Sequence, residues 1–506
     1  MRRLILALLV LVALASVALF VAWRERVVWA QQALDEALRR AAIPGATATL
    51  AAVELDQLRI RDVALGTEPI FRAGEIVLQA PWPELRAGRV AGVTVREAEL
   101  RVRLEAERIS LGSLDPWLAT PANESTSGPP LIPLDRLTLE DFSVAVDGDL
   151  GALRVDVEGE LFLPERGRVE AALAVVAHRK DSFIAGRLEA EAVHEDGGWQ
   201  GQGELRIPES MIDSTWLSLA PGLRDTVLGI RGLAAADIAF ELDQDGPTAR
   251  ATLALAGIDL RTPWGRIEGI HGTLQVDGPE PLSTPPGQLL AIRSMDVGLP
   301  LLDGLIEFQL FPDGAIDIQS ATWHWAGGTL RAAGVLQPDA ETNEATLHVE
   351  GLELELLFEQ VQLEGLSGSG KLAGYVPIFQ DGEQIRIEGG RLAATGPGRI
   401  RLAPSVVLGA AAGPDSQLAL IFDVLEDFHF EELSMDLDGD TRGELDLGVH
   451  LKGSNPNFEG GRVVEFNLNL EARLADLVRT GLTVYRLPDK IQERLDSFRA
   501  AQEDSP

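Results

Sequence analysis

Cysteine is absent from this 506-residue chain, and aromatic side chains are scarce, with only 2 tyrosines. The absence of cysteine excludes disulfides, thiol catalysis and thiolate metal sites. Basic residues are also few, because 44 lysines and arginines stand against 78 acidic residues, for a net charge of −34. A chain without a basic stripe cannot neutralise phosphate backbones, so nucleic acid is excluded as a partner.

Motifs that would carry catalysis are missing too. No GxSxG elbow and no HExxH helix occur. The stretch GLSGSGKL, residues 365–372, is close to a phosphate-binding loop, but Leu372 stands where that loop needs a serine or threonine. The aspartates of residues 436–444 have calcium-loop spacing without its glycine and final glutamate. We therefore expect no enzyme, no cofactor and no metal site, and a hairpin turn centred on Asp438-Gly439.

The long hydrophobic run of the chain lies near its N-terminus. Residues 4–23, LILALLVLVALASVALFVAW, carry no charge, and about 20 apolar residues suffice to span the ~30 Å hydrocarbon core of a bilayer. The rival interpretation is a signal peptide cleaved after Ala13-Leu14-Ala15. Because the apolar run continues past that box, we favour an uncleaved transmembrane anchor over residues 1–23. Either way, the rest of the chain is predicted to be exported.

Alternating hydrophobicity fills most of the remaining chain. A helical stripe is expected within residues 24–43, after which the period changes from 3.6 to 2. In EAELRVRLEAE, residues 97–107, every second side chain is apolar, which is typical of a half-buried strand. Similar runs recur about every ten positions, separated by glycine or Asp-Gly. The pattern predicts a mainly β protein of roughly thirty short antiparallel strands with few helices, and a helical tail over residues 481–506.

Such strands present one dry face that must be covered. The helical segments are too few to cover it, and aromatic side chains are scarce. The sheet can pack against a second sheet, as in a sandwich, or it can curl into an elongated trough whose apolar interior meets lipid. Strand periodicity alone does not decide between these two architectures.

Four blocks of the second half carry a family resemblance. They are MDVGLPLLDGLIEFQLFPDGAIDIQSATWHWAGGTLRA (295–332), LHVEGLELELLFEQVQLEGLSGSGKLAGYVPI (347–378), GEQIRIEGGRLAATGPGRIRL (382–402) and LGVHLKGSNPNFEGGRVVEFNLNLEARLADLVRT (447–480). In order and spacing they resemble the YdbH-like branch of the AsmA-like, or bridge-like lipid transfer, superfamily, over roughly residues 290–500. The resemblance implies a transmembrane helix followed by an elongated, curled antiparallel β-sheet trough. We expect an N-terminal β-trough region at 44–293 and a C-terminal YdbH-like region at 294–480.

The resemblance also implies a location and a function. It implies a bacterial inner-membrane, single-pass protein whose bulk lies in the periplasm and carries phospholipid acyl chains toward the outer membrane. Residues 4–23 would contact the inner membrane. About thirty strands at ~4.8 Å spacing reach on the order of 140 Å, so we expect a small outer-membrane lipoprotein to extend the sheet edge. The alternative is a scaffold that tethers the envelope membranes, with its apolar face closed by sheet-on-sheet packing.

The dry side of the C-terminal strands supplies candidate groove residues. The candidates are Ile306, Phe308, Leu310, Trp323, Trp325, Leu347, Val349, Leu352, Leu354, Leu445, Leu447, Val449, Phe466, Leu468 and Leu470. In this region Ile316 and Ile318 have the opposite parity to Trp323 and Trp325. We therefore expect a β-bulge or turn between the two pairs.

Overall fold

The structure is a computed structural model that describes residues 27–473 with gaps, the longest at 82–89, 116–133 and 404–422. The predicted anchor, residues 4–23, and the predicted tail, residues 481–506, lie outside the described residues. None of the described helices has the length and apolarity that a membrane crossing requires. α4, for example, covers eight residues, Leu354–Val361, whereas a span needs about 20. This finding corrects the predicted single-pass inner-membrane location, which is therefore wrong.

The chain forms two compact units, which are treated separately. Unit 1 comprises residues 1–225 and 233–252, and unit 2 comprises residues 226–232 and 253–506. β11 (Gly229–Asp243) and β12 (Gly246–Thr262) contribute residues to both units. The chain is mainly β and mostly antiparallel, with few helices among the described residues, as predicted. The elongated, curled trough and the four domain boundaries remain predictions.

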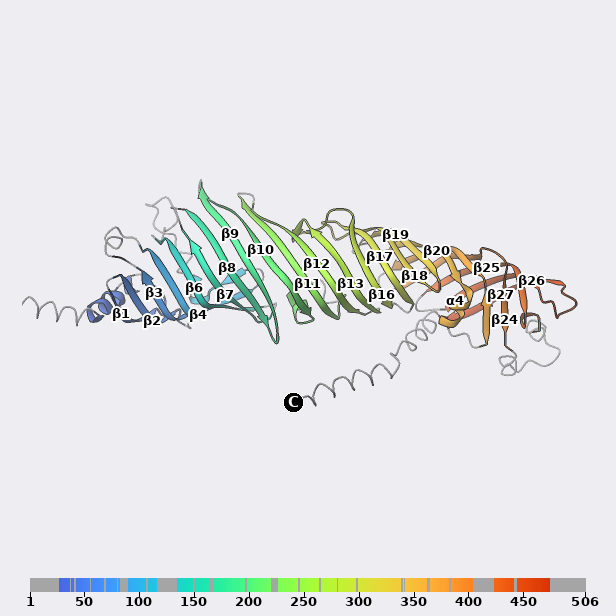
Figure 1. The fold of residues 1–506 in the computed structure, drawn as a ribbon, viewed down its shortest axis with the longest axis horizontal. Coiled ribbons are helices and arrows are strands. Elements are labelled where there is room, and N and C mark those ends of the chain that lie inside the picture. Colours follow the sequence, from blue (N-terminus) through green and yellow to red (C-terminus); the bar gives the residue numbers. More distant parts are fainter. Residues whose placement is uncertain are drawn as a thin grey trace, which may run out of the picture. The chain divides into compact units, whose positions relative to one another are not determined.

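Unit 1 is a sheet in which neighbours in sequence are neighbours in space (Figure 1). One pair departs from the antiparallel pattern, because β4 and β6 run parallel. A helix over residues 27–36 and 38–40 precedes the first strand, within the predicted range 24–43. The elements are β1 (Thr47–Val53), β2 (Gln57–Leu65), β3 (Phe71–Gln79), β4 (Gly92–Glu105), β5 (Arg108–Ser110), η1 (Gly112–Leu114), β6 (Arg136–Gly148), β7 (Leu153–Phe162), β8 (Arg168–Arg179), β9 (Ser182–Glu195), β10 (Gly198–Asp213) and η2 (Trp216–Leu219).

Unit 2 has the same hairpin pattern and contains the helix α4. The elements are β13 (Gly265–Val276), β14 (Gly278–Pro279), β15 (Leu282–Ser283), β16 (Gln288–Asp296), β17 (Pro300–Leu310), β18 (Ile316–Trp325), β19 (Gly328–Leu336), β20 (Asn343–Glu353), α4 (Leu354–Val361), β21 (Leu366–Ser369), β22 (Lys371–Asp381), β23 (Gln384–Ala394), β24 (Gly398–Leu402), β25 (Phe428–Asp440), β26 (Glu444–Ser454) and β27 (Val463–Arg473). The hairpin turn expected at Asp438-Gly439 is wrong, because β25 runs through these residues to Asp440.

Several strands are longer than the spacing of glycines suggested. β10 has 16 residues and β12 has 17. Gly257 and Gly269 lie inside β12 and β13 at positive φ values of 63° and 67°. Glycine adopts that backbone conformation without a steric penalty, so a glycine that looks like a turn in the sequence can instead mark an irregularity within a strand.

The bulge predicted in β18 is confirmed. The register between β18 and β19 shifts between Ile318 and Ala321. A β-bulge places one extra residue in one strand and so reverses the parity of the later residues of that strand. Ile318 and Trp323 therefore face the same side of the sheet despite their opposite parity in sequence.

One candidate lies on a helix and not on a strand. Leu354 was expected to continue the alternation of Leu352, but β20 ends at Glu353 and α4 begins at Leu354. The sequence also fits a helix from this point, because Leu354, Leu357 and Phe358 follow the i, i+3, i+4 pattern of an amphipathic helix. The Leu354 N–H donates to the carbonyl of Gly370 at 3.0 Å, which joins the start of the helix to the neighbouring chain.

Candidate functional site

The strand registers bring the sequence-predicted candidates of unit 2 onto one face of its sheet. Directly opposite residues of an antiparallel pair share a face, so a row of partners can be followed from strand to strand. One such row across β18, β19, β20, β22, β23, β25, β26 and β27 is Trp323, Leu330, Val349, Gly374, Leu392, Met435, Val449 and Leu468. The other candidates on strands lie on the same face, beside this row.

These candidates differ in how much solvent they meet. Trp323, Val349 and Leu352 are buried, with 5%, 3% and 1% of their surface exposed. Ile306 and Leu468 are half-buried. A methyl group at Gly304 would collide with the Trp323 ring, so the glycine leaves room for the indole beside the adjacent strand. The buried candidates already pack against protein, and the half-buried ones retain an accessible surface.

A sealed core closes the apolar face around α4. Leu354, Leu372 and Phe428 have no exposed surface, and Phe430 has 1%. Val424 also has no exposed surface, and Asn455 Nδ2 donates to the carbonyls of residues 423 and 424 at 3.1 Å. Protein atoms fill this end of unit 2, so it is a structural core.

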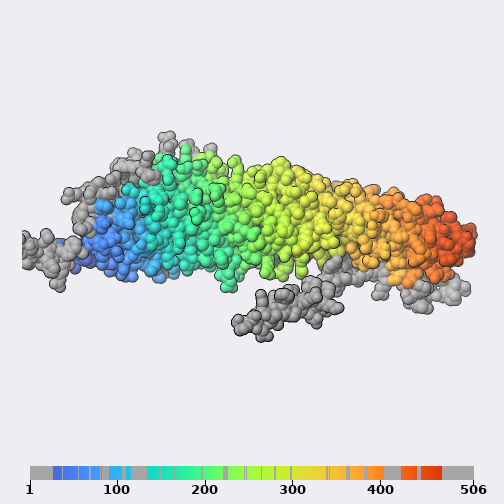
Figure 2. Space-filling view, viewed as in Figure 1, coloured from blue at the N-terminus to red at the C-terminus, as the bar shows by residue number. Residues whose placement is uncertain are grey.

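Unit 1 contains an apolar face that is not sealed. The residues facing one side of β7, β8, β9 and β10 are, in part, Val155, Val157, Leu161, Leu173, Val175, Ile184, Leu188, Leu205 and Ile207. Each of them is half-buried. Within the described residues of unit 1, no hydrophobic side chain after Leu134 is buried. Figure 2 shows described residues of these strands at the surface of the face that it draws.

The first strands of the same unit behave differently. Leu50, Ile60 and Val95 belong to a buried cluster on β1–β4. Val27 and Leu34 of the N-terminal helix pack against that cluster. The apolar face of unit 1 is thus covered where it begins and accessible along β7–β10.

The open face of β7–β10 was missed by the sequence reasoning. In β8, RVEAALAVVAHR, alanines and valines occupy both faces, which blurs the alternation that marks a half-buried strand. The neighbouring strand β7 could have revealed this face, because its Leu153, Val155 and Val157 alternate with charged residues. The register then assigns the faces of β8 from those of β7.

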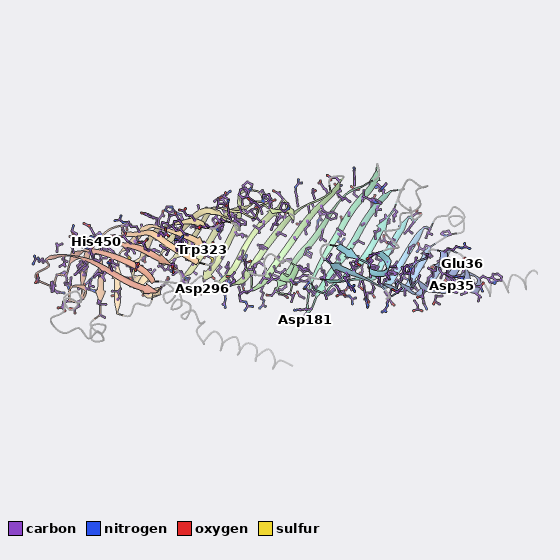
Figure 3. All side chains as sticks on the ribbon, turned by 180° about the vertical axis from the view of Figure 1, so that it is seen from behind. Asp35, Glu36, Asp181, Asp296, Trp323 and His450 are labelled. Atoms are coloured by element: carbon purple, nitrogen blue, oxygen red, sulfur yellow. The ribbon has the colours of Figure 1, made fainter. Side chains whose placement is uncertain are left out.

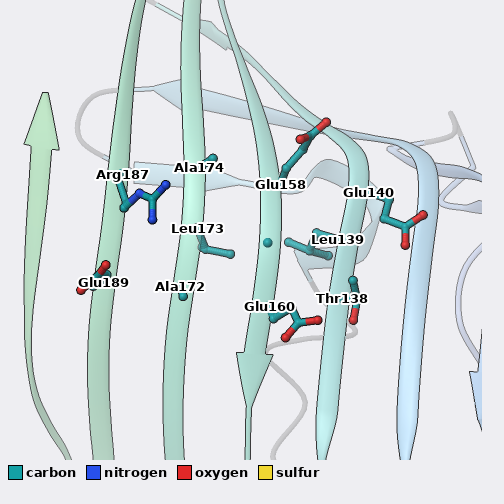
Figure 4. Close-up of a pocket in the computed structure, with 11 residues that line it drawn as sticks. Thr138, Leu139, Glu140, Glu158, Glu160, Ala172, Leu173, Ala174, Arg187 and Glu189 are labelled. Atoms are coloured by element: carbon teal, nitrogen blue, oxygen red, sulfur yellow. The ribbon is translucent and has the colours of Figure 1, made fainter. Parts of the chain in front are cut away.

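The opposite face of these strands carries charge and a shallow hollow. The hollow has a volume of ≈ 520 Å³ and is lined by Glu158 and Glu160 of β7 and by Arg187 and Glu189 of β9. Ala172 and Ala174 of β8 lie between these two strands, and both are exposed. Figure 4 shows Glu158, Arg187 and Glu189 among the side chains that line the hollow. The sheet therefore separates a polar surface from an apolar one.

One carboxylate in unit 2 has a strongly perturbed pKa. A hydrogen bond from Arg399 lowers the pKa of Asp427 from 3.8 to about 2, against the opposing effect of burial and with help from the charge of Arg399 and a hydrogen bond from Arg401. His429 Nε2 lies 3.6 Å from Asp427 Oδ1. The side chain of Asp427 is 20% exposed. This arrangement clamps the start of β25 to β24 and places no nucleophile or acid–base pair beside a pocket.

The described part of the chain contains no candidate metal site. No group of three or more histidine, aspartate or glutamate side chains there could hold a metal ion. The arrangement can therefore offer apolar contact along a strand face, bordered by charged side chains that remain in water.

Comparisons with known proteins found a family that matches this chain. A family model named YdbH-like, described as intermembrane phospholipid transport protein YdbH, matches residues 13–223 and 218–496. The match includes the N-terminal half, where the sequence blocks gave no specific resemblance. Searches of curated proteins and of solved structures found no match.

Proposed function

Because this chain belongs to the YdbH-like family of intermembrane phospholipid transport proteins, we propose that it carries phospholipid acyl chains along the apolar face of its strands. The observation that carries the proposal is the half-buried aliphatic face of β7–β10 in unit 1. Large accessible apolar surfaces on a protein usually mark a binding site. The family supplies phospholipid as the cargo.

The physical driving force is the removal of apolar surface from water. Each Å² of apolar surface that leaves water contributes about 25 cal/mol, and both the acyl chain and the aliphatic face gain from contact. The headgroup stays at the rim of the strands, in water. Such binding has little directionality, so neighbouring positions along the face hold an acyl chain about equally well. No covalent step is required, in keeping with a transport family and not an enzyme family.

The scaffold alternative has less support. It requires a second sheet that closes the apolar face. Among the described strands, the sheet other than the large one consists of the short pair β14 and β15. Two strands of two residues each cannot cover the face of β7–β10.

We place the proposed lipoprotein partner at the last strand. Within the described residues, β27 pairs with β26 along one edge. An unpaired strand edge can accept a further strand by main-chain hydrogen bonding. A small outer-membrane lipoprotein that adds a strand to this edge would extend the apolar surface.

The experiment is a pair of substitutions on opposite faces of β8. Leu173→Asp places a carboxylate on the apolar face, whereas Ala174→Asp places one on the polar face, opposite Arg187. Because the Leu173 site is half-buried, water can hydrate the new carboxylate and the fold should survive. We expect Leu173→Asp to lose most of the co-purifying phospholipid and Ala174→Asp to retain it. Mass spectrometry measures the lipid, and thermal unfolding checks the fold.

Two outcomes would count against the proposal. A folded Leu173→Asp protein with a normal lipid content would remove the acyl-chain role of β7–β10. A Leu173→Asp protein that does not fold, beside a folded Ala174→Asp protein, would favour the scaffold and its closed core.

A further inference from the structure

The first strand of unit 1 has its outer edge occupied by a side chain. Gln31, on the helix over residues 27–40, accepts a hydrogen bond at Oε1 from the N–H of Leu50 at 2.5 Å. Its Nε2 donates to the carbonyl of Ala48 at 3.1 Å. The other edge of β1 pairs with β2. The amide of Gln31 therefore satisfies one donor and one acceptor on the edge that faces away from the sheet.

This pair of contacts imitates a neighbouring strand. In a β-strand, the N–H of one residue and the C=O of the residue two positions earlier point to the same side, and an added strand would bond to both. A glutamine amide carries one acceptor and two donors in one plane, so it fits this pair. The second donor of Gln31 goes to Asp35 Oδ1 at 2.7 Å, which fixes the orientation of the amide. Asp35 and its neighbour Glu36 are labelled on this helix in Figure 3.

Hydrophobic contacts hold the helix that carries Gln31. Val27, Ala30 and Leu34 pack against the buried cluster of β1–β4. Gln31 lies between these positions in the sequence, so the packing fixes the height of its amide along β1. The edge is thus blocked by a docked helix and by a specific hydrogen-bonded pair.

We propose that Gln31 is an edge lock that prevents a second copy of this chain from adding its β27 to β1. Among the described strands, β27 is an edge strand of unit 2, and without Gln31 β1 would be an edge strand of unit 1. Two such edges on one molecule can join head to tail, and a heterologous contact that does not close produces open filaments. Natural sheets commonly protect their edges against this outcome. The inference does not depend on what the apolar face carries.

The test compares Gln31→Ala with Gln32→Ala in the full-length chain in detergent. Gln32 is the adjacent residue and is exposed, so its substitution controls for helix propensity. Removing one hydrogen-bond partner should speed amide exchange at Leu50 roughly fivefold. We also expect the mass of Gln31→Ala, measured by light scattering, to rise with concentration. High salt in both measurements screens repulsion between chains that each carry a net charge of −34.

The absence of cysteine allows a direct readout of the contact. Thr49 in β1 and Asn469 in β27 are both exposed. A protein with Thr49→Cys, mixed with one carrying Asn469→Cys, should form an intermolecular disulfide in the Gln31→Ala background. The same mixture in the Gln32→Ala background should stay reduced.

Two outcomes would contradict the proposal. If Leu50 exchanges at the same rate in Gln31→Ala and Gln32→Ala, Gln31 does not lock the edge. A second variant, Gln31→Ala with Leu34→Ala, also loosens the packing of the helix. If this variant exposes the Leu50 amide and remains a monomer without a mixed disulfide, the edge does not recruit a second copy, and the proposal is overturned.

Discussion

Two charged residues of unit 2 show that the contribution of an ion pair to stability depends on its exposure to solvent. Lys371, from the stretch that is close to a phosphate-binding loop, begins β22 and lies 3.3 Å from Glu353, with 59% and 42% of the two side chains exposed. Pairs this exposed contribute about 0–1 kcal/mol. Asp427 is 20% exposed and bonds to Arg399 and Arg401, so its contribution is larger. The lysine belongs to a stretch that stands out in the sequence, but the aspartate contributes more to the stability of the fold.

Asp427→Asn should destabilise the protein at neutral pH. Loss of the charge-assisted hydrogen bonds to the two arginines is expected to cost roughly 1–3 kcal/mol. The folded pKa of about 2 lies below the ordinary 3.8, so the stabilisation is complete above pH 3.8 and is lost as the pH falls through about 2. Denaturant unfolding at a series of pH values should therefore show the difference between the two proteins shrinking over that window.

Asp446→Asn is the matched control for this experiment. Asp446 is an exposed aspartate on β26, so its substitution should leave the unfolding midpoint nearly unchanged. A destabilisation in Asp427→Asn that persisted unchanged at pH values near 2 would contradict the assignment of the effect to ionised Asp427.

At the scale of elements, α4 decides where the apolar face of unit 2 is closed. The helix begins with the fully buried Leu354, and Phe358 lies against Gly368 of β21, where a methyl group would collide with its ring. Gly370 and Gly398 leave room for Phe430 in the same way. The small residues of GLSGSGKL are therefore required by packing. They allow two strands to approach the aromatic core beneath the helix.

Leu354→Ala should open this core. Replacing a fully buried leucine by alanine costs about 2–5 kcal/mol, because the lost burial is joined by a residual cavity. The neighbouring Glu355 is exposed, so Glu355→Ala should change the free energy of unfolding by no more than about 0.5 kcal/mol. Chemical denaturation followed by tryptophan fluorescence measures both. Equal effects of the two substitutions would show that α4 does not seal the core.

At the scale of the whole molecule, net charge controls the approach to membranes. The chain carries −34, and an anionic membrane surface repels it at long range. Repulsion between exposed charges is screened over about 8 Å at physiological ionic strength and over shorter distances as salt rises. Charge should thus influence the rate of encounter with a membrane, whereas the apolar face determines what is held.

Lipid transfer should therefore depend on salt in a way set by the acceptor. With anionic acceptor vesicles, transfer of a fluorescent phospholipid should accelerate as salt is added. With zwitterionic vesicles it should change little, because no surface charge opposes the encounter. Fluorescence dequenching measures both rates. Transfer to anionic vesicles that slowed with salt would indicate a local basic contact and contradict this prediction.

The sequence by itself determined the fold class and the family. Alternation at period 2 in segments such as residues 97–107 is a local property of strands, and four blocks in order identified the YdbH-like relationship. It also gave the bulge in β18, because the parity of Ile318 and Trp323 can be counted along the chain.

Only the tertiary structure decided which apolar residues are accessible. Leu173 and Leu372 are both aliphatic strand residues, yet Leu173 is half-buried and Leu372 has no exposed surface. The difference comes from tertiary packing, because Leu372 shares a fully buried core with Leu354 of α4 and with Val424, whereas the apolar residues of β7–β10 are only half-buried. Leu354 was predicted to lie on a strand because the short pattern around it fits both the period of a strand and the period of a helix. Packing over the core selects the helix. Periodicity determines which face is apolar, but whether that face is covered depends on long-range contacts that periodicity does not contain.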